Sequence, residues 1–251
     1  MVIFLCGRRP EEIFCGVYDA WMSRLGHSNV RLELDGDYNY ELFAEYRPVE
    51  VTEEKTKKVV QAIRRKISEE AYRCVYRAAL SKEPGRADAI YRFLIYGFHM
   101  GQGVVDAIQL PAVHEIFRLN RAVANEAHLL TEFLRFSQLP ERVLFGVIGP
   151  RNDVTALLMP HFSDRLRMER FIIYDEKRKK AGIHTGGTAW YLLEGEEAEV
   201  LGRMAGKTDA GEYEALWKAF FHSISIRERE NYVCQRSHLP LRYRPYMTEF
   251  Q

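Results

Sequence analysis

The order of strand-like and helical segments constrains the fold of this chain more than any other sequence feature. Residues 132–136 and 142–148 read as strands, and Leu139-Pro140-Glu141 between them is typical of a hairpin turn. The segments expected to follow are a helix over 154–167, capped by Asn152-Asp153, and strands over 171–175 and 183–193. The sequence therefore predicts an antiparallel sheet with a β-hairpin–helix–β-hairpin unit in the C-terminal half.

The first half reads mainly as helical. Val2–Cys6 and Val30–Leu34 are predicted strands, and 42–51 is a third extended segment that Pro48 favours as a sheet edge. The helical spacing of apolar residues then predicts helices over 11–25, 69–80 and 86–100. Two more helices are expected, one that begins after Thr52 as its N-cap and one that begins at Pro111. A further helix is expected from Gly211 to about Arg227, capped by Asp209.

This order predicts the α+β class, a helical region plus an antiparallel sheet. We expect one domain over 1–251, subdivided near Thr131 into a mixed, largely helical part (1–130) and a sheet-bearing part with a C-terminal helix and basic tail (131–251). The 47% hydrophobic and 28% charged content is that of a folded protein rather than a disordered one.

The sequence predicts a cytoplasmic protein without a membrane contact. It has no run of 18 apolar residues, and Met1–Leu5 lacks the flanks of a signal peptide. The four cysteines (Cys6, Cys15, Cys74 and Cys234) are dispersed, as expected of reduced thiols.

The formal net charge of +1 hides an uneven distribution. Lys55–Arg77 contains eight basic and two acidic residues, and Lys218–Arg244 contains six basic and two acidic residues. In contrast, Glu194–Glu214 contains seven acidic and two basic residues. A uniformly basic DNA coat is excluded, but a localised anion-binding face is compatible with this pattern.

The basic tail is the main candidate for nucleic-acid binding. Arginine forks match phosphates and aromatic rings offer stacking faces to bases. The candidate residues are Arg135, Arg165, Lys218, Arg227, Arg229, Gln235, Arg236, His238, Arg242, Tyr243 and Arg244. The alternative is an ordinary solvated surface with arginine–carboxylate pairs.

Two positions are candidates for acid–base catalysis. His161 and Asp164 stand three residues apart on a predicted helix beside Arg165, so they share a face as base and orienting acid. His222 is the other candidate. An interior histidine beside a surface ion pair is the alternative, and the sequence leaves open whether the protein is an enzyme.

Metal and cofactor signals are weak. Cys234 and His238 are four residues apart, but a paired C-x-x-C is absent, so a structural thiol and a capping histidine are favoured over a metal site. Gly101-Gln-Gly103 with Ala107 has the outline of a phosphate-binding helix–hairpin–helix turn, with a plain helix break as the alternative. No P-loop, dinucleotide fingerprint or H-E-x-x-H occurs, and no cofactor is predicted.

Several segments resemble a bacterial family of DNA metabolism and DNA repair proteins whose biochemistry is unassigned. The resembling stretches are Ile13–His27, Asn125–Phe136, Met159–Arg165, Phe171–Arg178 and, most specifically, Tyr213–Phe250. The family's motif residues that occur here are His128, Arg135, His161, Asp164, Arg165, Trp217, His222, Arg227, Cys234, Arg236, His238, Arg242 and Arg244.

The resemblance implies a DNA-linked role. Members are encoded beside a radical SAM protein, and a related domain precedes uracil-DNA glycosylase-like domains. We therefore expect a DNA-binding accessory protein that works with a radical SAM partner. A DNA-acting enzyme using His161 or His222, and a protein–protein adaptor for the radical SAM enzyme, are the alternatives.

Overall fold

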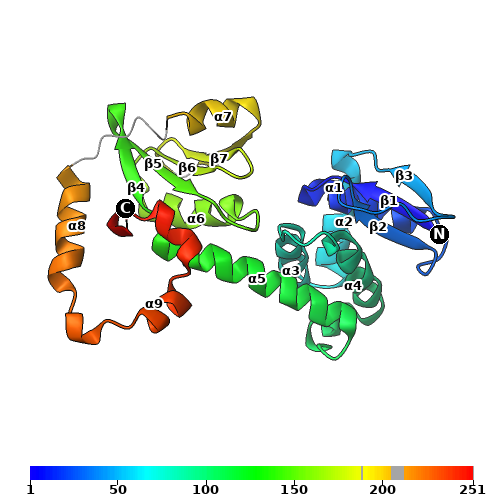
Figure 1. The fold of residues 1–251 in the computed structure, drawn as a ribbon. Helices are drawn as coiled ribbons and strands as arrows, with labels where there is room; N and C mark the ends of the chain where they lie inside the picture. The colour runs from blue at the N-terminus through cyan, green and yellow to red at the C-terminus, as the bar shows by residue number, and fades with distance from the viewer. Residues whose placement is uncertain (188, 205–211, 251) are drawn as a thin grey trace. The chain divides into compact units, whose positions relative to one another are not determined.

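The computed structural model describes residues 1–187, 189–204 and 212–250, and its class is α+β as predicted (Figure 1). The chain divides into two compact units, Met1–Asn125 and Glu126–Gln251. The dividing point lies inside helix α5 (Pro111–Phe133), a few residues before the boundary expected near Thr131.

The N-terminal unit combines a small sheet with a helical layer. Its elements are β1 (Val2–Cys6), α1 (Pro10–Met22), β2 (Val30–Leu34), β3 (Glu45–Pro48), α2 (Glu53–Lys66), α3 (Glu69–Ala79), α4 (Arg86–Met100), the 3-10 helix η1 (Gly101–Asp106) and the first part of α5.

The sheet of this unit is parallel, with strand order β2-β1-β3. α1 connects β1 to β2, since parallel neighbours need a crossover. Sequence analysis did not predict this β–α–β arrangement, although both strands were placed correctly. Pro48 lies in the edge strand β3, as expected of a residue without a backbone N–H.

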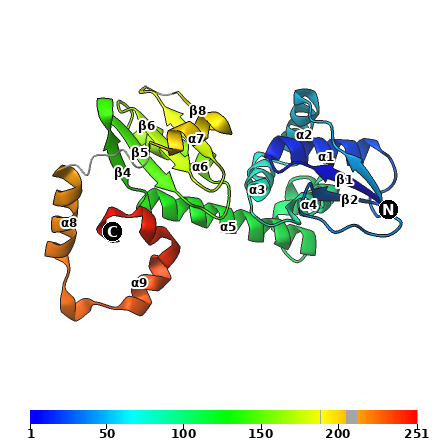
Figure 2. The ribbon, with the colours of Figure 1, turned by 45° about the horizontal axis from the view of Figure 1, so that its top comes forward.

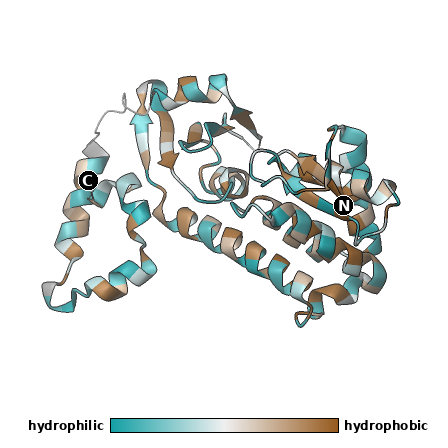
Figure 3. Ribbon diagram, turned by 45° about the vertical axis from the view of Figure 1, so that its right-hand side comes forward, coloured by the Kyte–Doolittle hydropathy of each residue, from teal (hydrophilic) through white to brown (hydrophobic). Residues whose placement is uncertain are grey.

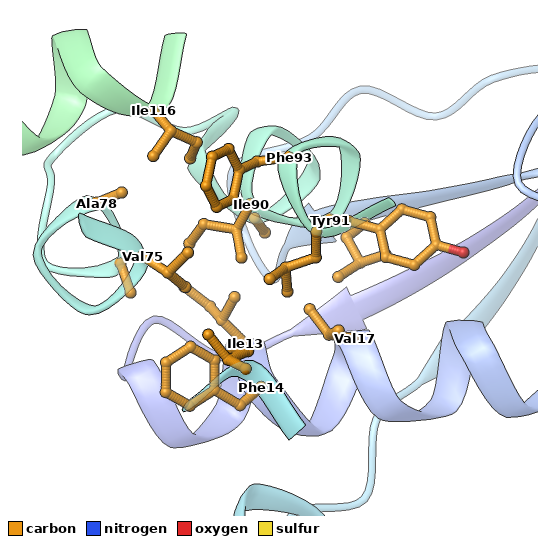
Figure 4. Packing of buried hydrophobic residues seen from close by; sticks show 14 of the residues in the cluster. Ile13, Phe14, Val17, Val75, Ala78, Ile90, Tyr91, Phe93 and Ile116 are labelled. Atoms are coloured by element: carbon orange, nitrogen blue, oxygen red, sulfur yellow. The ribbon is translucent and has the colours of Figure 1, made fainter. Parts of the chain in front are cut away.

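The core of the N-terminal unit is shared by its helices. Figure 4 shows residues of α1, α3, α4 and α5 packed together, among them Ile13, Val75, Phe93 and Ile116, each fully buried. α2 joins this core through Val59, Ile63 and Ile67, the stripe predicted from its spacing of four. Thr52 caps α2 as predicted, because its hydroxyl accepts the N–H of Lys55 at 3.3 Å.

The C-terminal unit contains the predicted hairpin–helix–hairpin. Its elements are the end of α5, β4 (Phe136–Leu139), η2 (Pro140–Arg142), β5 (Val143–Ile148), α6 (Thr155–Arg165), β6 (Phe171–Asp175), β7 (Lys180–His184), β8 (Trp190–Glu194), α7 (Glu196–Gly202), α8 (Glu212–Ile224), η4 (Arg227–Arg229), α9 (Tyr232–His238), η5 (Leu241–Tyr246) and η6 (Thr248–Phe250).

The strands of this unit form one five-stranded sheet in chain order, β4 to β8. β5 and β6 pair in parallel across the α6 connection, and the other neighbours are antiparallel. β6 is buried along its whole length, and its Tyr174 belongs to a buried cluster with Phe145 of β5 and Ala181 of β7. A strand buried on both faces suits a position between two others, and β6 holds the centre of the sheet.

Two predicted strand segments differ from the structure. Glu132 and Phe133 are not in a strand, because α5 continues through them and the N–H of Leu134 still bonds to the carbonyl of Leu130 at 3.0 Å. A short apolar run cannot distinguish a helix end from a strand. The segment 183–193 is two strands, β7 and β8, turned at Gly186-Gly187, where φ is 93° and 96°.

The helix caps expected in the second half are also corrected. Val154, not Asn152-Asp153, precedes α6, and its side chain makes no capping bond. Asn152 and Asp153 instead bond to Glu126 and Lys180. Asp209 lies outside the described residues, and α8 ends at Ile224 rather than near Arg227.

The helix break predicted around Gly101 occurs at this glycine. Gly101 adopts a positive φ of 64° where α4 gives way to η1, so the chain breaks the helix at this glycine. Among the described helices, none has both the length and the apolar character to cross a bilayer.

Candidate nucleic-acid interface

The tail of the C-terminal unit runs as α8, turns through η4 into α9, and comes back through η5 and η6 (Figures 1 and 2). We refer to residues 212–238 as the arm and to residues 239–250 as the return segment. Apolar residues recur along α8, in brown in Figure 3. Part of that apolar face is held by the return segment: Phe221 contacts Phe250 with ring centroids 5.7 Å apart, and the indole of Trp217 donates to Glu249 at 3.1 Å.

Arg135 holds the return segment to the end of α5. Its guanidinium bonds to both carboxylate oxygens of Glu249, at 2.7 and 3.3 Å, and lies 5.4 Å from the ring centroid of Trp217. The Glu249 side chain is only 2% exposed. Its burial would raise the pKa of the carboxyl, but Arg135, a backbone N–H and the Trp217 indole outweigh that effect, so the pKa is lowered. Glu249 is therefore charged at neutral pH.

Glu126 makes the second attachment of the return segment. It is 3% exposed and accepts the backbone N–H groups of Arg151 and Asn152 at 2.9 and 2.8 Å. The Tyr243 hydroxyl also donates to it at 3.4 Å, and Arg242 lies over the Tyr243 ring at 4.5 Å. Burial first, and then the charge of Glu126, raise the pKa of Tyr243, so this phenol stays protonated.

The loop between β5 and α6, residues 149–153, is held from several sides. Arg178 donates to the carbonyl of Pro150 at 3.2 Å and pairs with the fully buried Asp175 at 2.9 Å. Lys180 pairs with Asp153 at 2.9 Å and with Glu194 at 3.1 Å. Glu126 and these side chains thus join α5, the loop, β6, β7 and the return segment into one polar network.

Tyr246 extends this network to the far end of the return segment. Its hydroxyl donates to Glu176, and burial together with that carboxylate raises the pKa of the phenol. Gly149 lies directly against it, since a Cβ at that position would stand 1.9 Å from the Tyr246 hydroxyl oxygen. Only glycine fits there without a shift of the tyrosine.

Several predicted nucleic-acid residues therefore bind groups of the protein itself. Tyr243 is 2% exposed and donates to Glu126, so its ring offers no open face to a base. Arg135 pairs with Glu249, Arg242 donates to the Tyr243 hydroxyl at 2.8 Å, and Arg244 donates to Gln235 at 2.9 Å. Arg244 also lies 4.8 Å from the ring centroid of Phe250. These contacts brace the arm and the return segment.

The other predicted cations of the tail lie on the arm. Arg229 and Arg236 are exposed and Lys218 is half-buried, and within the described part of the chain none of the three has an ion pair. His222 and His238 are exposed on the same arm. The backbone of Arg227 is in η4, but its side chain lies outside the described part.

A half-open hollow of about 550 Å³ lies where the arm turns. It brings together four predicted residues, His222, Arg229, Cys234 and Gln235. The other residues of its lining are Phe221, Ile224, Ser225, Ile226, Glu230, Asn231 and Tyr232.

The basic run on α2 has a different environment. Lys55 pairs with Asp19, and Lys57 and Lys58 pair with Glu53 and Glu54. Arg64 pairs with Glu69 at 3.0 Å. Much of the charge of this run is thus compensated locally, so it is a weaker candidate than the arm for binding phosphate.

The predicted catalytic pair is not assembled. His161 and Asp164 are both exposed on α6, and no hydrogen bond joins them in the part of the chain that the structure describes. His161 contacts the ring of Phe162, at 5.0 Å between centroids. Arg165 is exposed at the end of the same helix, and its role in binding stays a prediction.

Cys234 and His238, the weak candidates for a metal site, have no third ligand among the described residues. Cys234 Sγ and His238 Nδ1 are 3.7 Å apart within one turn of α9. Among the described residues no group of three His, Cys, Asp or Glu side chains could hold a metal ion. Cys6 is buried in the N-terminal unit, and burial raises its pKa to about 12, so its thiol is protonated.

Sequence analysis missed the carboxylates that anchor the tail, Glu126 and Glu249. One signal was present for Glu126. It falls on the same face of α5 as the buried Val123 and Leu130, and a lone carboxylate among core positions needs a partner. Glu249 lies in a segment without periodicity and gave no comparable signal.

The N-terminal unit has its own apolar pocket of about 380 Å³. Helices α1, α2 and α4 line it with residues that include Trp21, Val59 and Phe98. None of the predicted site residues belongs to this lining.

The model of one protein family, described as a domain of unknown function (DUF4130), matches residues 84–249. The match takes in α4, α5, the five-stranded sheet, the arm and nearly all of the return segment. Among curated proteins, none matches the chain.

Proposed function

Since the chain belongs to the family of the domain of unknown function DUF4130, we propose its function from the arm: it is an accessory protein that binds DNA through this segment and works with a radical SAM enzyme. The observation that supports DNA binding is the charge state of the arm. Lys218, Arg229 and Arg236 have no carboxylate partner within the described residues, whereas most cations of α2 do. Unpaired cations are the groups that gain most from a phosphate.

The proposal assigns different roles to two groups of basic residues in the C-terminal unit. Arg135, Arg242 and Arg244 brace the tail, and the arm's outer cations contact the phosphates. Replacing a brace would change stability as well as binding. Replacing an outer cation would change binding alone, so the outer residues give the cleaner test.

The test is fluorescence anisotropy with labelled single-stranded and duplex DNA at several salt concentrations. We expect the logarithm of the affinity to fall linearly with the logarithm of salt. The triple variant Lys218→Gln/Arg229→Gln/Arg236→Gln should bind more weakly and reduce the slope by about 2 on single strands, at ~0.7 for each lost phosphate contact. The matched control is Lys57→Gln/Lys58→Gln, which removes exposed but paired cations of α2 and should leave the slope unchanged. No binding of either DNA at low salt would rule the proposal out.

A second function, a protein–protein adaptor, is favoured by an exposed apolar row on α8. Leu216, Phe220 and Ile224 recur every fourth residue and are 56, 52 and 57% exposed. Such a row is typical of a helix that docks on another protein. Co-purification with a radical SAM protein, the partner that the family resemblance implies, would test it. The variant Leu216→Ser/Phe220→Ser should abolish co-elution without affecting the salt slope on DNA.

A further inference from the structure

The hollow at the turn of the arm has a lining that phosphate binding does not require. Phe221 and Tyr232 contribute aromatic rings, and Tyr232 is 63% exposed. Asn231 and Gln235 contribute carboxamides, and Arg229 and His222 contribute a guanidinium and an imidazole. A purely electrostatic contact needs only the last two.

The two carboxamides are fixed so that their donors are available. The Asn231 side-chain oxygen accepts the N–H of Cys234 at 3.0 Å as it caps α9, and the Gln235 oxygen accepts from Arg244 at 2.9 Å. Each carboxamide therefore has its oxygen engaged and its NH₂ group left to donate. Glu230, the carboxylate of the lining, accepts the Tyr232 hydroxyl at 2.9 Å.

Rings, NH₂ donors and an adjacent arginine are the groups that hold an unpaired base. The flat face of a base stacks on an aromatic ring, its edge presents acceptors to amide donors, and the next phosphate pairs with arginine. In a duplex the base faces are stacked on one another, so the two aromatic rings would find no face to stack on there. The hollow, at about 550 Å³, is within the usual size range of small-ligand sites.

From this lining we infer that the hollow binds an unpaired nucleobase, so that the arm prefers single-stranded DNA to duplex DNA. The inference rests on the proposed DNA binding and specifies which form of DNA is bound. Tyr232 and Phe221 stack on the base, Asn231 and Gln235 donate to its edge, and Arg229 contacts the neighbouring phosphate.

The test uses the full-length protein and an oligonucleotide that carries 2-aminopurine, whose fluorescence is quenched by stacking. We expect quenching on the single strand and a lower affinity for the same sequence as a duplex. Tyr232→Ala should weaken single-strand binding about tenfold and abolish the quenching, as for the loss of one stacked base. Tyr232→Phe should preserve both, because the ring is retained.

Two further variants separate stacking from general effects. Gln235→Leu should weaken binding to the single strand while leaving the duplex affinity unchanged. Tyr191→Ala removes a tyrosine that is 48% exposed on β8, outside the hollow, and should change neither readout. A cooperative thermal transition will show that each variant is folded. Tyr232→Ala and Tyr191→Ala should keep the wild-type midpoint, whereas Gln235→Leu removes the acceptor of Arg244 and should lower it.

The outcomes distinguish this inference from the proposed function. If single-stranded and duplex DNA bind equally well and the 2-aminopurine signal does not change, the base site is wrong and DNA binding by the arm stands. If neither DNA binds at low salt, both are wrong.

Discussion

Arg135 and Glu249, 114 residues apart in the sequence, form a two-point ion pair at 2.7 and 3.3 Å in which the carboxylate is almost completely buried. With Glu126 and Tyr243 it fixes the return segment to the end of α5. The arm is held at its start by the sheet, where Ser137 of β4 donates to Glu214 at 2.6 Å, and at its end by the return segment.

Glu249→Gln should destabilise the C-terminal unit by about 1.5–3 kcal/mol, because charge-assisted bonds from Arg135 and Trp217 lose their anion. Urea denaturation will measure the free energy of unfolding. In a Trp21→Phe/Trp190→Phe background, which leaves Trp217 as the single indole, the emission maximum will shift to the red as the return segment detaches. Glu197→Gln, an exposed position on α7, is the control and should change the stability little. A Glu249→Gln protein as stable as the wild type would show that the pair contributes nothing.

The attachment should also weaken in acid. The folded-state pKa of Glu249 lies below its ordinary value of 4.5, so the stabilisation is complete above that pH and is lost as the pH falls through the folded-state pKa. A pH titration of Trp217 emission should therefore show a transition below pH 4.5. In Glu249→Gln this transition should be absent, and its persistence would assign it to another group.

Glu126→Ala should be the more severe of the two anchor variants, with a loss of about 3 kcal/mol or more. It leaves the buried N–H of Asn152 and the partly buried N–H of Arg151 without their acceptor and removes the partner of Tyr243. Hydrogen exchange followed by mass spectrometry should show faster exchange in residues 149–153 and in the return segment. Glu126→Gln keeps one acceptor and should be intermediate, and an ordering with Gln worse than Ala would contradict this account.

Gly149→Ala should displace Tyr246, because the new Cβ would stand 1.9 Å from its hydroxyl oxygen. We expect a loss of about 1–3 kcal/mol, the usual cost of overpacking. The steric cause has a specific test. In a Tyr246→Ala background the same glycine substitution should cost much less, since the clashing atoms are gone. If both backgrounds show the same cost, the strain arises elsewhere at Gly149.

Much of the fold could be predicted from local patterns. Val2–Cys6 and Phe171–Asp175 were placed to the residue, and the stripe of Val59, Ile63 and Ile67 gave the buried face of α2. These elements carry their signal within a few residues. The end of α5 could not be predicted, because residues 133–136 suit either a helix or a strand until their partners are known.

The site was predictable only as a set of residue types. The arginines of the tail look alike in sequence, yet Arg135 and Arg242 turn inward to carboxylates while Arg229 and Arg236 turn outward. What separates the two groups is the position of Glu126 and Glu249 in three dimensions. Pairing over more than a hundred residues leaves no trace in local periodicity or charge counts.

The attachment of the return segment has a consequence for the timing of synthesis. Glu126 and Arg135 leave the ribosome early in the C-terminal unit, and their partners Tyr243 and Glu249 are among its last residues. Until the return segment has emerged, Glu126 lacks Tyr243, Arg135 lacks Glu249, and the β5–α6 loop lacks Tyr246. Contacts this distant in sequence also slow folding. The nascent unit should therefore stay open to chaperones and proteases until translation has passed residue 249, so a codon change that slows the ribosome over the arm would prolong its exposure.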